Sequence, residues 1–273
     1  MAPELPRPAS ADQQAPTRGS PFVIPQYLKE DIDPAQSTWP LAAYCFITGW
    51  IDVTSFSAVF VWCAFQTGNT LQLGLALART FSPGEDRSWH IADRQALTSL
   101  LTFLFGAFLG RIGDRIGAKT RLWLVLGTFL QALFTMAGAI VLWRSGQGSV
   151  ASDRGDPSWT NALSYVGLGF ISASMGLQGI MGKRINTQFA TSIVLTTVWC
   201  ELMADPKLFN LRQIVTTRDH KVLGIFALFL GGFLSRAALQ SIGTPAALGI
   251  GCGVRVLITI SWLFVPAKVK AGK

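Results

Sequence analysis

The sequence has few charged residues. Asp, Glu, Lys and Arg make up 14% of its 273 residues, whereas a soluble domain carries nearer a quarter. Histidine and cysteine are also scarce. The two histidines lie in polar segments, which excludes a histidine-rich metal centre, and the four cysteines lack CxxC spacing, which argues against a zinc site or a disulfide framework. We therefore expect no metal and no cofactor.

Catalytic signatures are missing as well. The chain has no HExxH, GxSxG, Walker A or protein-kinase motif, and no cluster of acid and base groups, so we expect no enzymatic activity. The formal charge is +8, but the basic residues lie mainly in loops and tails. They form no stripe with interleaved aromatic residues, so we expect no binding of nucleic acid.

The sequence is instead rich in long apolar runs, and half of its residues are hydrophobic. Two shorter blocks, 64–78 and 188–203, adjoin the first and fourth of six longer ones. A hydrocarbon core about 30 Å thick is crossed by about 20 apolar residues of helix. The sequence therefore predicts an all-α integral membrane protein whose partner is the lipid bilayer, with six crossings and six to eight helical segments, two of them broken or short. The six long blocks are 41–63, 96–113, 121–143, 159–182, 221–241 and 245–265.

The chain divides into one hydrophobic domain and two polar tails. Residues 1–38 are rich in Pro, Gln, Ala and Ser, which predicts a disordered tail without a signal peptide. Residues 39–266 are predicted to form a single transmembrane helical domain. Residues 267–273 form a short basic tail.

An internal similarity divides the hydrophobic domain into two halves. Residues 103–111 (FLFGAFLGR) match residues 228–236 (LFLGGFLSR) at an offset of 125 residues. The glycine, the Phe-Leu pair, the small residue and the arginine align. We therefore predict related halves at 40–143 and 159–265.

Loop charge predicts how the halves are oriented. The loop at 111–121, the loop at 204–221 and the C-terminal tail are basic, whereas the loops at 79–95 and 144–158 are balanced by acidic residues. Three crossings in each half place every basic loop and both termini in the cytoplasm, as the positive-inside rule requires. Four crossings in each half would place the loop at 111–121 on the opposite side. Three crossings make the halves inverted repeats, an arrangement common in secondary transporters. The particular membrane is not indicated.

Asp52 is an acidic residue at the centre of the first apolar block. A carboxylate at this depth is costly and tends to face a partner or a hydrated cavity. One interpretation is a proton, cation or substrate site. The other is a buried ion pair with a cation such as Arg255, central in the last block.

A polar segment interrupts the apolar sequence after the first block: Gln66, Thr67, Gly68, Asn69 and Thr70. Asn69 or Thr67 is suited to cap a following helix. A capped half-helix that begins at membrane depth presents free N–H groups to an anion or polar solute. An ordinary tight turn between short helices is the alternative.

The second half has its own polar residue, Gln178, which lies between Gly176 and Gly179 in an apolar block and needs a hydrogen-bond partner. The glycines indicate close helix packing, which is also compatible with a homo-oligomer.

These residues carry a resemblance to a known family. The segment Gly49-Trp50-Ile51-Asp52, followed by a TGN segment that runs into Leu73-Gly74, resembles the YoaK-like family, domain of unknown function 1275. The resemblance covers about residues 40–265. It implies an integral membrane protein without established activity and marks Asp52, Thr67, Gly68 and Asn69. Residues 191–193 in the second half lack the glycine and asparagine, so any site is asymmetric.

We predict a small multipass transporter or permease for a small polar solute or ion. Its mid-membrane site would contain Asp52, the segment Gln66 to Thr70, Gln178 and, as a counter-charge, Arg255. The alternative is a membrane scaffold or assembly partner that transports nothing, in which Asp52 and Arg255 form a structural pair. Fold analogy alone does not decide between these functions.

Overall fold

The computed structural model describes residues 25–84, 86–187, 189, 193, 195–210 and 212–268. All regular elements in these ranges are helices, and two isolated β-bridges occur outside them. The short elements lie at the ends of the molecule or beside it. They are α1 (Gln26–Lys29), η1 (Pro34–Gln36), α3 (Gln66–Phe81), α5 (Ile112–Ile116) and α8 (Thr196–Met203).

Five helices are long and apolar enough to cross a membrane. They are α2 (Thr38–Val59), α4 (Ile91–Leu109) continued by α5 to Ile116, α6 (Arg121–Ser145), α7 (Ala162–Ile185) and α9 (Thr216–Phe264). Helix α2 has 22 residues and so a length of about 33 Å, which matches a hydrocarbon core of about 30 Å. The prediction of an all-helical membrane protein is confirmed at this level.

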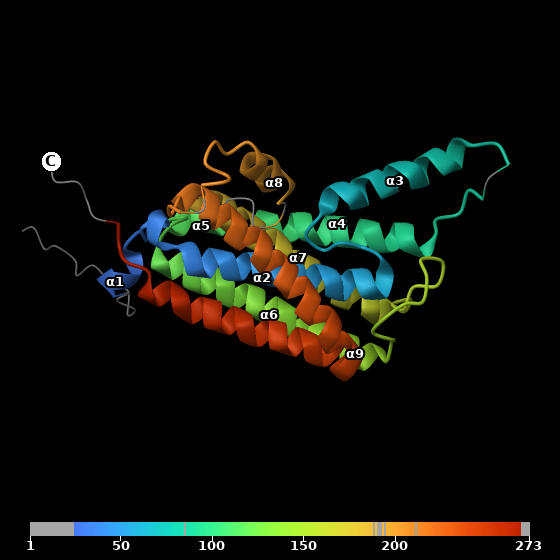
Figure 1. Cartoon of the computed structure of the whole chain (residues 1–273). Helices are drawn as coiled ribbons and strands as arrows, with labels where there is room; N and C mark the ends of the chain where they lie inside the picture. Colours follow the sequence, from blue (N-terminus) through green and yellow to red (C-terminus); the bar gives the residue numbers. More distant parts are fainter. Residues whose placement is uncertain are drawn as a thin grey trace, which may run out of the picture.

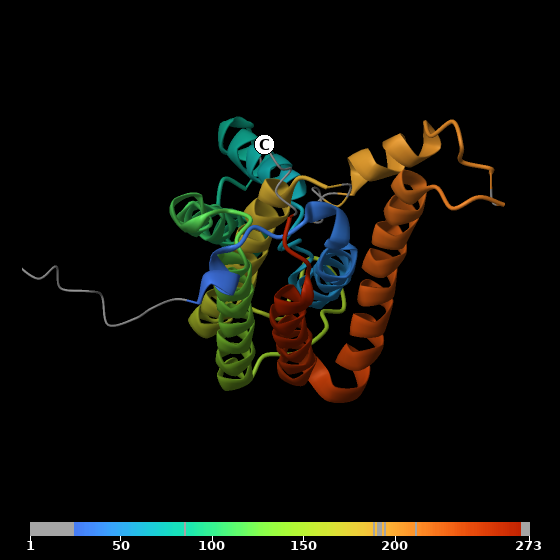
Figure 2. The same cartoon turned by 90° about the vertical axis from the view of Figure 1, so that its left-hand side faces the viewer.

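Helix α9 is bent sharply at Gly243. Its 49 residues would extend over about 73 Å if straight, more than twice the thickness of a hydrocarbon core. Gly243 has φ 75° and ψ 172°, a conformation that residues with a Cβ avoid, and Pro245 follows without an N–H to continue the ladder. Figure 2 shows the two parts of α9 as separate legs joined at this bend. The sequence predicts two blocks here, and the bend lies between them.

The long helices run along one common axis, and α3 diverges from the bundle beside α4 (Figure 1). The main packing partners are α2 with α9, α4 with α7, and α6 with both α7 and α9. Among the described residues, the main packing partner of helix α3 is α4. The core is therefore formed by long helices contributed by all parts of the hydrophobic sequence.

Both ends of the described chain meet at one end of the bundle. Arg121, at the start of α6, donates hydrogen bonds to the carbonyl oxygens of Val265 and Tyr27 and forms an ion pair with Glu30. Residues 25–37 are thus folded against the bundle, and α2 begins at Thr38. Most of the predicted tail at 1–38, residues 1–24, lies outside the described ranges, as do residues 269–273.

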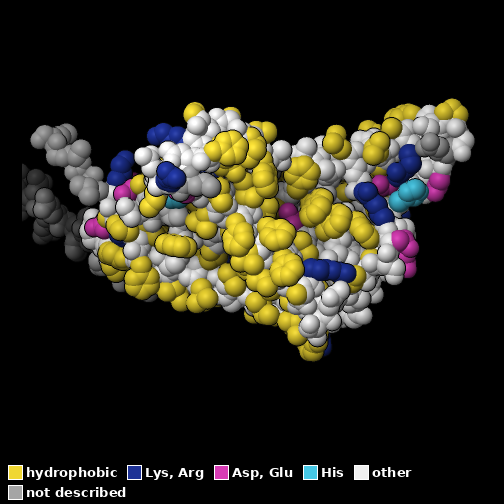
Figure 3. Space-filling view, in the orientation of Figure 1, with side chains coloured by type: hydrophobic (Ala, Val, Ile, Leu, Met, Phe, Trp, Pro, Cys, Tyr) yellow, Lys and Arg dark blue, Asp and Glu magenta, His cyan; other side chains and the backbone are white. Residues whose placement is uncertain are grey.

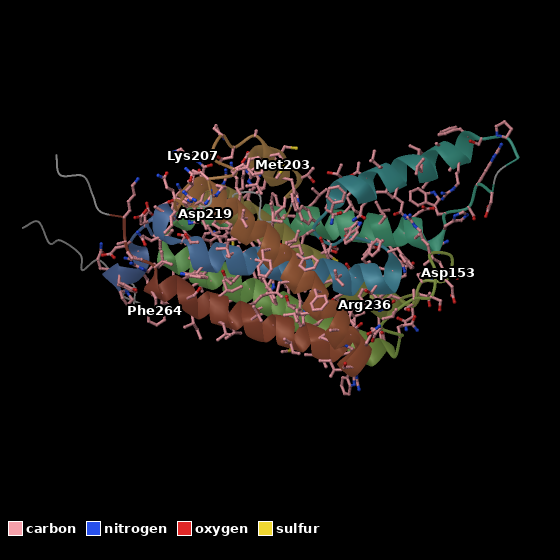
Figure 4. All side chains as sticks on the ribbon, viewed as in Figure 1. Asp153, Met203, Lys207, Asp219, Arg236 and Phe264 are labelled. Atoms are coloured by element: carbon pink, nitrogen blue, oxygen red, sulfur yellow. The ribbon has the colours of Figure 1, made fainter. Side chains whose placement is uncertain are left out.

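The surface agrees with a membrane orientation along this axis. Hydrophobic side chains cover most of the middle of the face in Figure 3, and charged side chains gather mainly towards its two ends. In Figure 4, Asp153 lies at one end, and Lys207, Asp219 and Phe264 lie towards the other. The loop after α5 also lies at the second end, because Ile32 donates to the carbonyl oxygen of Lys119 there.

Helices α2 and α9 are in backbone contact through glycine. A Cβ atom added to Gly49 would overlap the carbonyl oxygen of Leu228, and one added to Gly231 would overlap the carbonyl oxygen of Phe46. Each helix therefore places a glycine against the backbone of the other. Small residues of this kind allow membrane helices to approach closely and gain van der Waals contact.

Helices α7 and α4 repeat this contact. A Cβ atom added to Gly176 would overlap the carbonyl oxygen of Phe103, and one added to Gly106 would overlap the carbonyl oxygen of Ala173. In each of the four helices, the glycine lies three residues after the residue whose carbonyl oxygen faces the glycine of the partner helix. The two interfaces thus have the same design.

Candidate functional site

Asp52 binds the backbone of the segment that follows its own helix. Its Oδ1 accepts a hydrogen bond of 2.7 Å from the N–H of Ala64, and its side chain is buried. The chain turns back after Phe60, which has a left-handed conformation with φ 56°. The carboxylate therefore holds the segment 60–65 against α2.

Asp52 and Arg255 form no ion pair; in the described part of the chain their side chains have different partners. The buried pair considered from the sequence is therefore absent. The distance along the helix explains this. Gln131 hydrogen-bonds to both Arg255 and Tyr44, so Tyr44 marks the level of Arg255 along α2. Tyr44 is eight residues before Asp52, a rise of about 12 Å.

The amides of Gln66 and Asn69 converge on Ser99 of α4. Gln66 Nε2 donates to Ser99 Oγ at 3.0 Å and to the carbonyl oxygen of Cys63 at 2.7 Å. Asn69 Nδ2 donates to the carbonyl oxygen of Trp62 at 2.8 Å and to Gln66 Oε1 at 2.9 Å. Ser99 is also 3.0 Å from the Ser172 hydroxyl of α7. This network ties the start of α3 to the bundle.

The expected helix cap is wrong in its position. Helix α3 begins at Gln66, so Thr67, Gly68 and Asn69 belong to its first turns. The N-cap residue is Phe65, and no side-chain hydrogen bond caps the helix. Thr67 and Thr70 are exposed, and the Thr70 hydroxyl donates to the carbonyl oxygen of Gln66. The sequence was a good guide to a helix start in this segment, but the structure places it earlier.

Gln178 of α7 reaches α2. Its Nε2 donates to the Thr48 hydroxyl at 2.9 Å and to the carbonyl oxygen of Tyr44 at 3.1 Å. Its Oε1 is buried without a hydrogen-bond partner among the described residues. The NH2 group of the Gln178 amide therefore has the hydrogen-bond partners that burial requires, whereas its oxygen has none among the described residues.

Arg255 is fully buried in the last leg of α9 and contacts uncharged groups. Its Nη1 donates to Gln131 Oε1 of α6, and its Nη2 lies 3.3 Å from Ser174 Oγ and 3.2 Å from Met175 Sδ of α7. The Arg255 Nε is buried without a partner among the described residues. The cation lies where α6, α7 and α9 meet.

Gln131 extends this cluster to α2. Its Nε2 donates to the Tyr44 hydroxyl at 3.3 Å and lies 3.1 Å from Met181 Sδ. The Tyr44 and Thr128 hydroxyls are 2.6 Å apart, and Trp262 Nε1 donates to Thr128 at 3.0 Å. The sequence analysis did not select Gln131, although a buried amide in an apolar block was the same signal that selected Gln178. We call Arg255, Gln131, Tyr44, Thr128, Ser174 and Trp262 the central cluster.

The residues selected from the sequence thus belong to two networks. Asp52, Gln66 and Asn69 belong to the network around the segment 60–65, and Arg255 belongs to the central cluster. Gln178 lies beside the central cluster through its contact with Tyr44. The described residues contain no group of three His, Cys, Asp or Glu side chains that could hold a metal ion.

An open cavity of about 660 Å³, lined by both charged and apolar side chains, lies at the end of the molecule near the start of α4, between α3, α4 and the segment 154–157. Its lining includes Arg79, which pairs with Asp93, and Arg154, which donates to Gln72. Sequence reasoning did not find this cavity because its residues lie in loops and helix ends that are distant in the chain.

The chain belongs to the family described as Protein of unknown function (DUF1275), whose model matches residues 41–261. The resemblance seen in the sequence is therefore confirmed. The chain is also similar to an A-type ATP synthase subunit I of Pyrococcus abyssi (strain GE5 / Orsay), with 25% identity over 263 residues. That match covers 88% of this chain but 35% of the relative, so the chain spans about a third of its length. No solved structure matches the chain. This is a multipass helical membrane protein of the DUF1275 family.

Proposed function

We propose that this protein is a small transporter for a polar solute or ion, built from two inverted repeats. The observation that carries the proposal is the repeated glycine interface, once between α2 and α9 and once between α7 and α4. Inverted repeats that meet around a mid-membrane site are the common architecture of secondary transporters.

The bend at Gly243 supports six crossings. If each leg of α9 crosses once, the crossing helices are α2, α4 and α6 in one half and α7 and the two legs of α9 in the other. The end of the bundle that holds Arg121 and Lys207 then faces the cytoplasm together with both termini, because the basic loops at 111–121 and 204–221 lie there.

The polar groups supply the two parts of a transport site. The central cluster lies among α2, α6, α7 and α9, where the two halves meet. Helix α3 begins inside the bundle beside Ser99, and no side chain caps its first N–H groups. Such a broken helix end is a recurring solute contact in transporters. In this proposal Asp52 positions the segment 60–65, with Gln66, Thr67, Gly68, Asn69 and Thr70 after it, and Gln178 and Arg255 line the central site.

An uptake screen in reconstituted vesicles tests the proposal. The purified chain is inserted into liposomes and a panel of small solutes and ions is offered, with Asp52→Asn as the test variant and Gly74→Ala as the matched control. A Cβ atom at Gly74 meets nothing within 4 Å, so this control should leave transport unchanged. At least one solute should enter with wild type and the control, and it should enter more slowly with Asp52→Asn, because the neutral asparagine holds the segment 60–65 less tightly.

A non-transporting scaffold is favoured by one observation, the bond between Asp52 and the Ala64 N–H, which gives the carboxylate a local structural role. A chain whose Asp52→Asn variant folds and retains every cellular function, while wild type moves no solute in the screen, would be a scaffold. Swapping Asp52 and Arg255 does not separate the two functions, because these residues form no pair.

A further inference from the structure

We infer that the central cluster binds a small monovalent anion, with Arg255 as its main ligand. This inference rests on the proposed function and adds the class of its substrate. It begins from the charge of Arg255, which has 0% exposure and belongs to no ion pair in the described part of the chain.

An arginine side chain keeps its charge in proteins, and an isolated buried charge remains costly even after the surroundings relax. The partners of Arg255 are an amide oxygen, a hydroxyl and a thioether, all of them neutral. The buried acid Asp52 binds the Ala64 N–H instead. A negative charge at the central cluster would remove this cost, and one anion charge is sufficient for one guanidinium.

The hydrogen bonds of the cluster also favour an anion, because the cluster has more hydrogen-bond donors than strong acceptors to receive them. Two donors end on thioether sulfurs, which are weak acceptors: Arg255 Nη2 on Met175 Sδ and Gln131 Nε2 on Met181 Sδ. A third, Arg255 Nε, is buried without any partner among the described residues. An anion accepts from several such donors at once, and bonds between charged groups are about twice as strong as neutral ones.

The position of the cluster agrees with a transported ion. Gln131 and Arg255 contact one another, and each lies four residues after a glycine and four before a threonine, on α6 and on the last leg of α9. Thr135 and Thr259 each donate to the carbonyl oxygen of that residue at 2.8 Å. The two halves therefore meet at this pair, and the cation comes from one half. All side chains of the cluster are buried, which favours a small ion such as chloride or nitrate over a larger anion.

Thermal unfolding of the purified full chain in detergent tests the inference without requiring transport. Sodium chloride and sodium nitrate are compared with sodium gluconate at equal ionic strength, which keeps screening constant. Chloride or nitrate at about a hundred times its Kd should raise the Tm of wild type by about 5 °C over gluconate. The same rise is expected for Arg236→Gln, a matched arginine variant on the first leg of α9, whose Nη1 has no hydrogen-bond partner among the described residues.

Two variants should abolish the rise. Arg255→Gln removes the cation. Gln131→Glu places a carboxylate beside Arg255, so it supplies the missing negative charge within the protein and should raise the Tm in gluconate. Gln131→Glu keeps the test decisive if Arg255→Gln fails to fold. A wild type that does not distinguish chloride or nitrate from gluconate would overturn the inference, and so would a Gln131→Glu variant that keeps the full rise.

Flux measurements then separate this inference from the proposed function. Chloride release from reconstituted vesicles, followed with a chloride electrode, should occur with wild type and stop with Gln131→Glu. An anion-specific rise in Tm without flux would leave the binding site standing and contradict transport. Uptake of a neutral or cationic solute in the screen, without any anion-specific rise, would leave transport standing and refute the anion site.

Discussion

Two helix interfaces of the molecule have the same glycine packing but different polar surroundings. The interface of α2 with α9 and that of α7 with α4 each bury a pair of glycines against a partner backbone. Yet the residues around them differ. Ser99 lies four residues before Phe103 on α4, and the residue four positions before Leu228 on α9 is Gly224. Ser99 collects amides from the start of α3, whereas Gly224 faces the ring of Phe189.

The central pair differs in the same way. Gln131 on α6 is neutral, and Arg255 on the last leg of α9, which has the same spacing to a glycine and a threonine, is charged. Packing in a bilayer depends on close backbone approach, which any repeat must preserve to fold. A binding site depends on a few side chains, which can diverge separately in each half. The comparison therefore separates two similar glycine interfaces from polar groups that differ between them.

The largest effects should come from the shared packing. Gly49→Ala and Gly176→Ala each place a methyl group on a partner carbonyl oxygen, and each should destabilise the protein by about 3 kcal/mol, because overpacked backbone contacts cannot relax. Unfolding in a detergent titration measures both. Equal losses of stability in the two variants would support the equivalence of the two interfaces. A large loss in one variant beside a neutral result in the other would show that the two interfaces are not equivalent.

A smaller effect should come from the serine that only the first half has. Ser99→Ala removes a hydroxyl that Gln66 and Asn69 use, and should cost about 2 kcal/mol because it leaves buried amide donors underused. Gly224→Ala is the matched change in the second half. Its Cβ atom would lie 3.4 Å from the ring of Phe189, an ordinary contact, so it should be close to neutral. Similar costs at both positions would break the asymmetry.

Asp52→Asn should have a modest effect on stability, about 1 kcal/mol. The asparagine oxygen still accepts from Ala64, but a bond to a charged acceptor becomes a neutral one. Limited proteolysis of the segment 60–65 in detergent measures whether it loosens. Asp52→Ala should loosen it more, because the Ala64 N–H then loses its acceptor, and an unchanged cleavage rate in both variants would contradict the structural role of Asp52.

The smallest effect should come from glycines outside the shared interfaces. Gly74→Ala in α3 and Gly253→Ala in α9 meet nothing within 4 Å, so each should stabilise its helix by about 0.5 kcal/mol through helix propensity alone. Tm measurements against wild type are sufficient. A loss as large as that expected for Gly49→Ala would mean that these positions form a contact, for example with a second copy of the chain.

Much of the fold could be predicted from hydrophobic blocks, because a residue run that dissolves in lipid must satisfy its backbone as a helix. The blocks at 41–63, 121–143 and 159–182 correspond to α2, α6 and α7. The site was harder to predict. Asp52 and Asn69 are buried polar groups, as the sequence indicates, but their partners Ala64 and Ser99 were not identifiable from spacing.

The sequence by itself determined that the helices of this protein belong in lipid and not in water. Long apolar runs with few charges and basic loops belong in a bilayer, and that conclusion depends on composition and length, which need no tertiary contacts. The tertiary structure decided the pairing of the polar groups. Which buried donor finds which acceptor depends on how helices distant in the sequence pack, and so only the packed bundle separates Arg255 from Asp52 and brings it to Gln131.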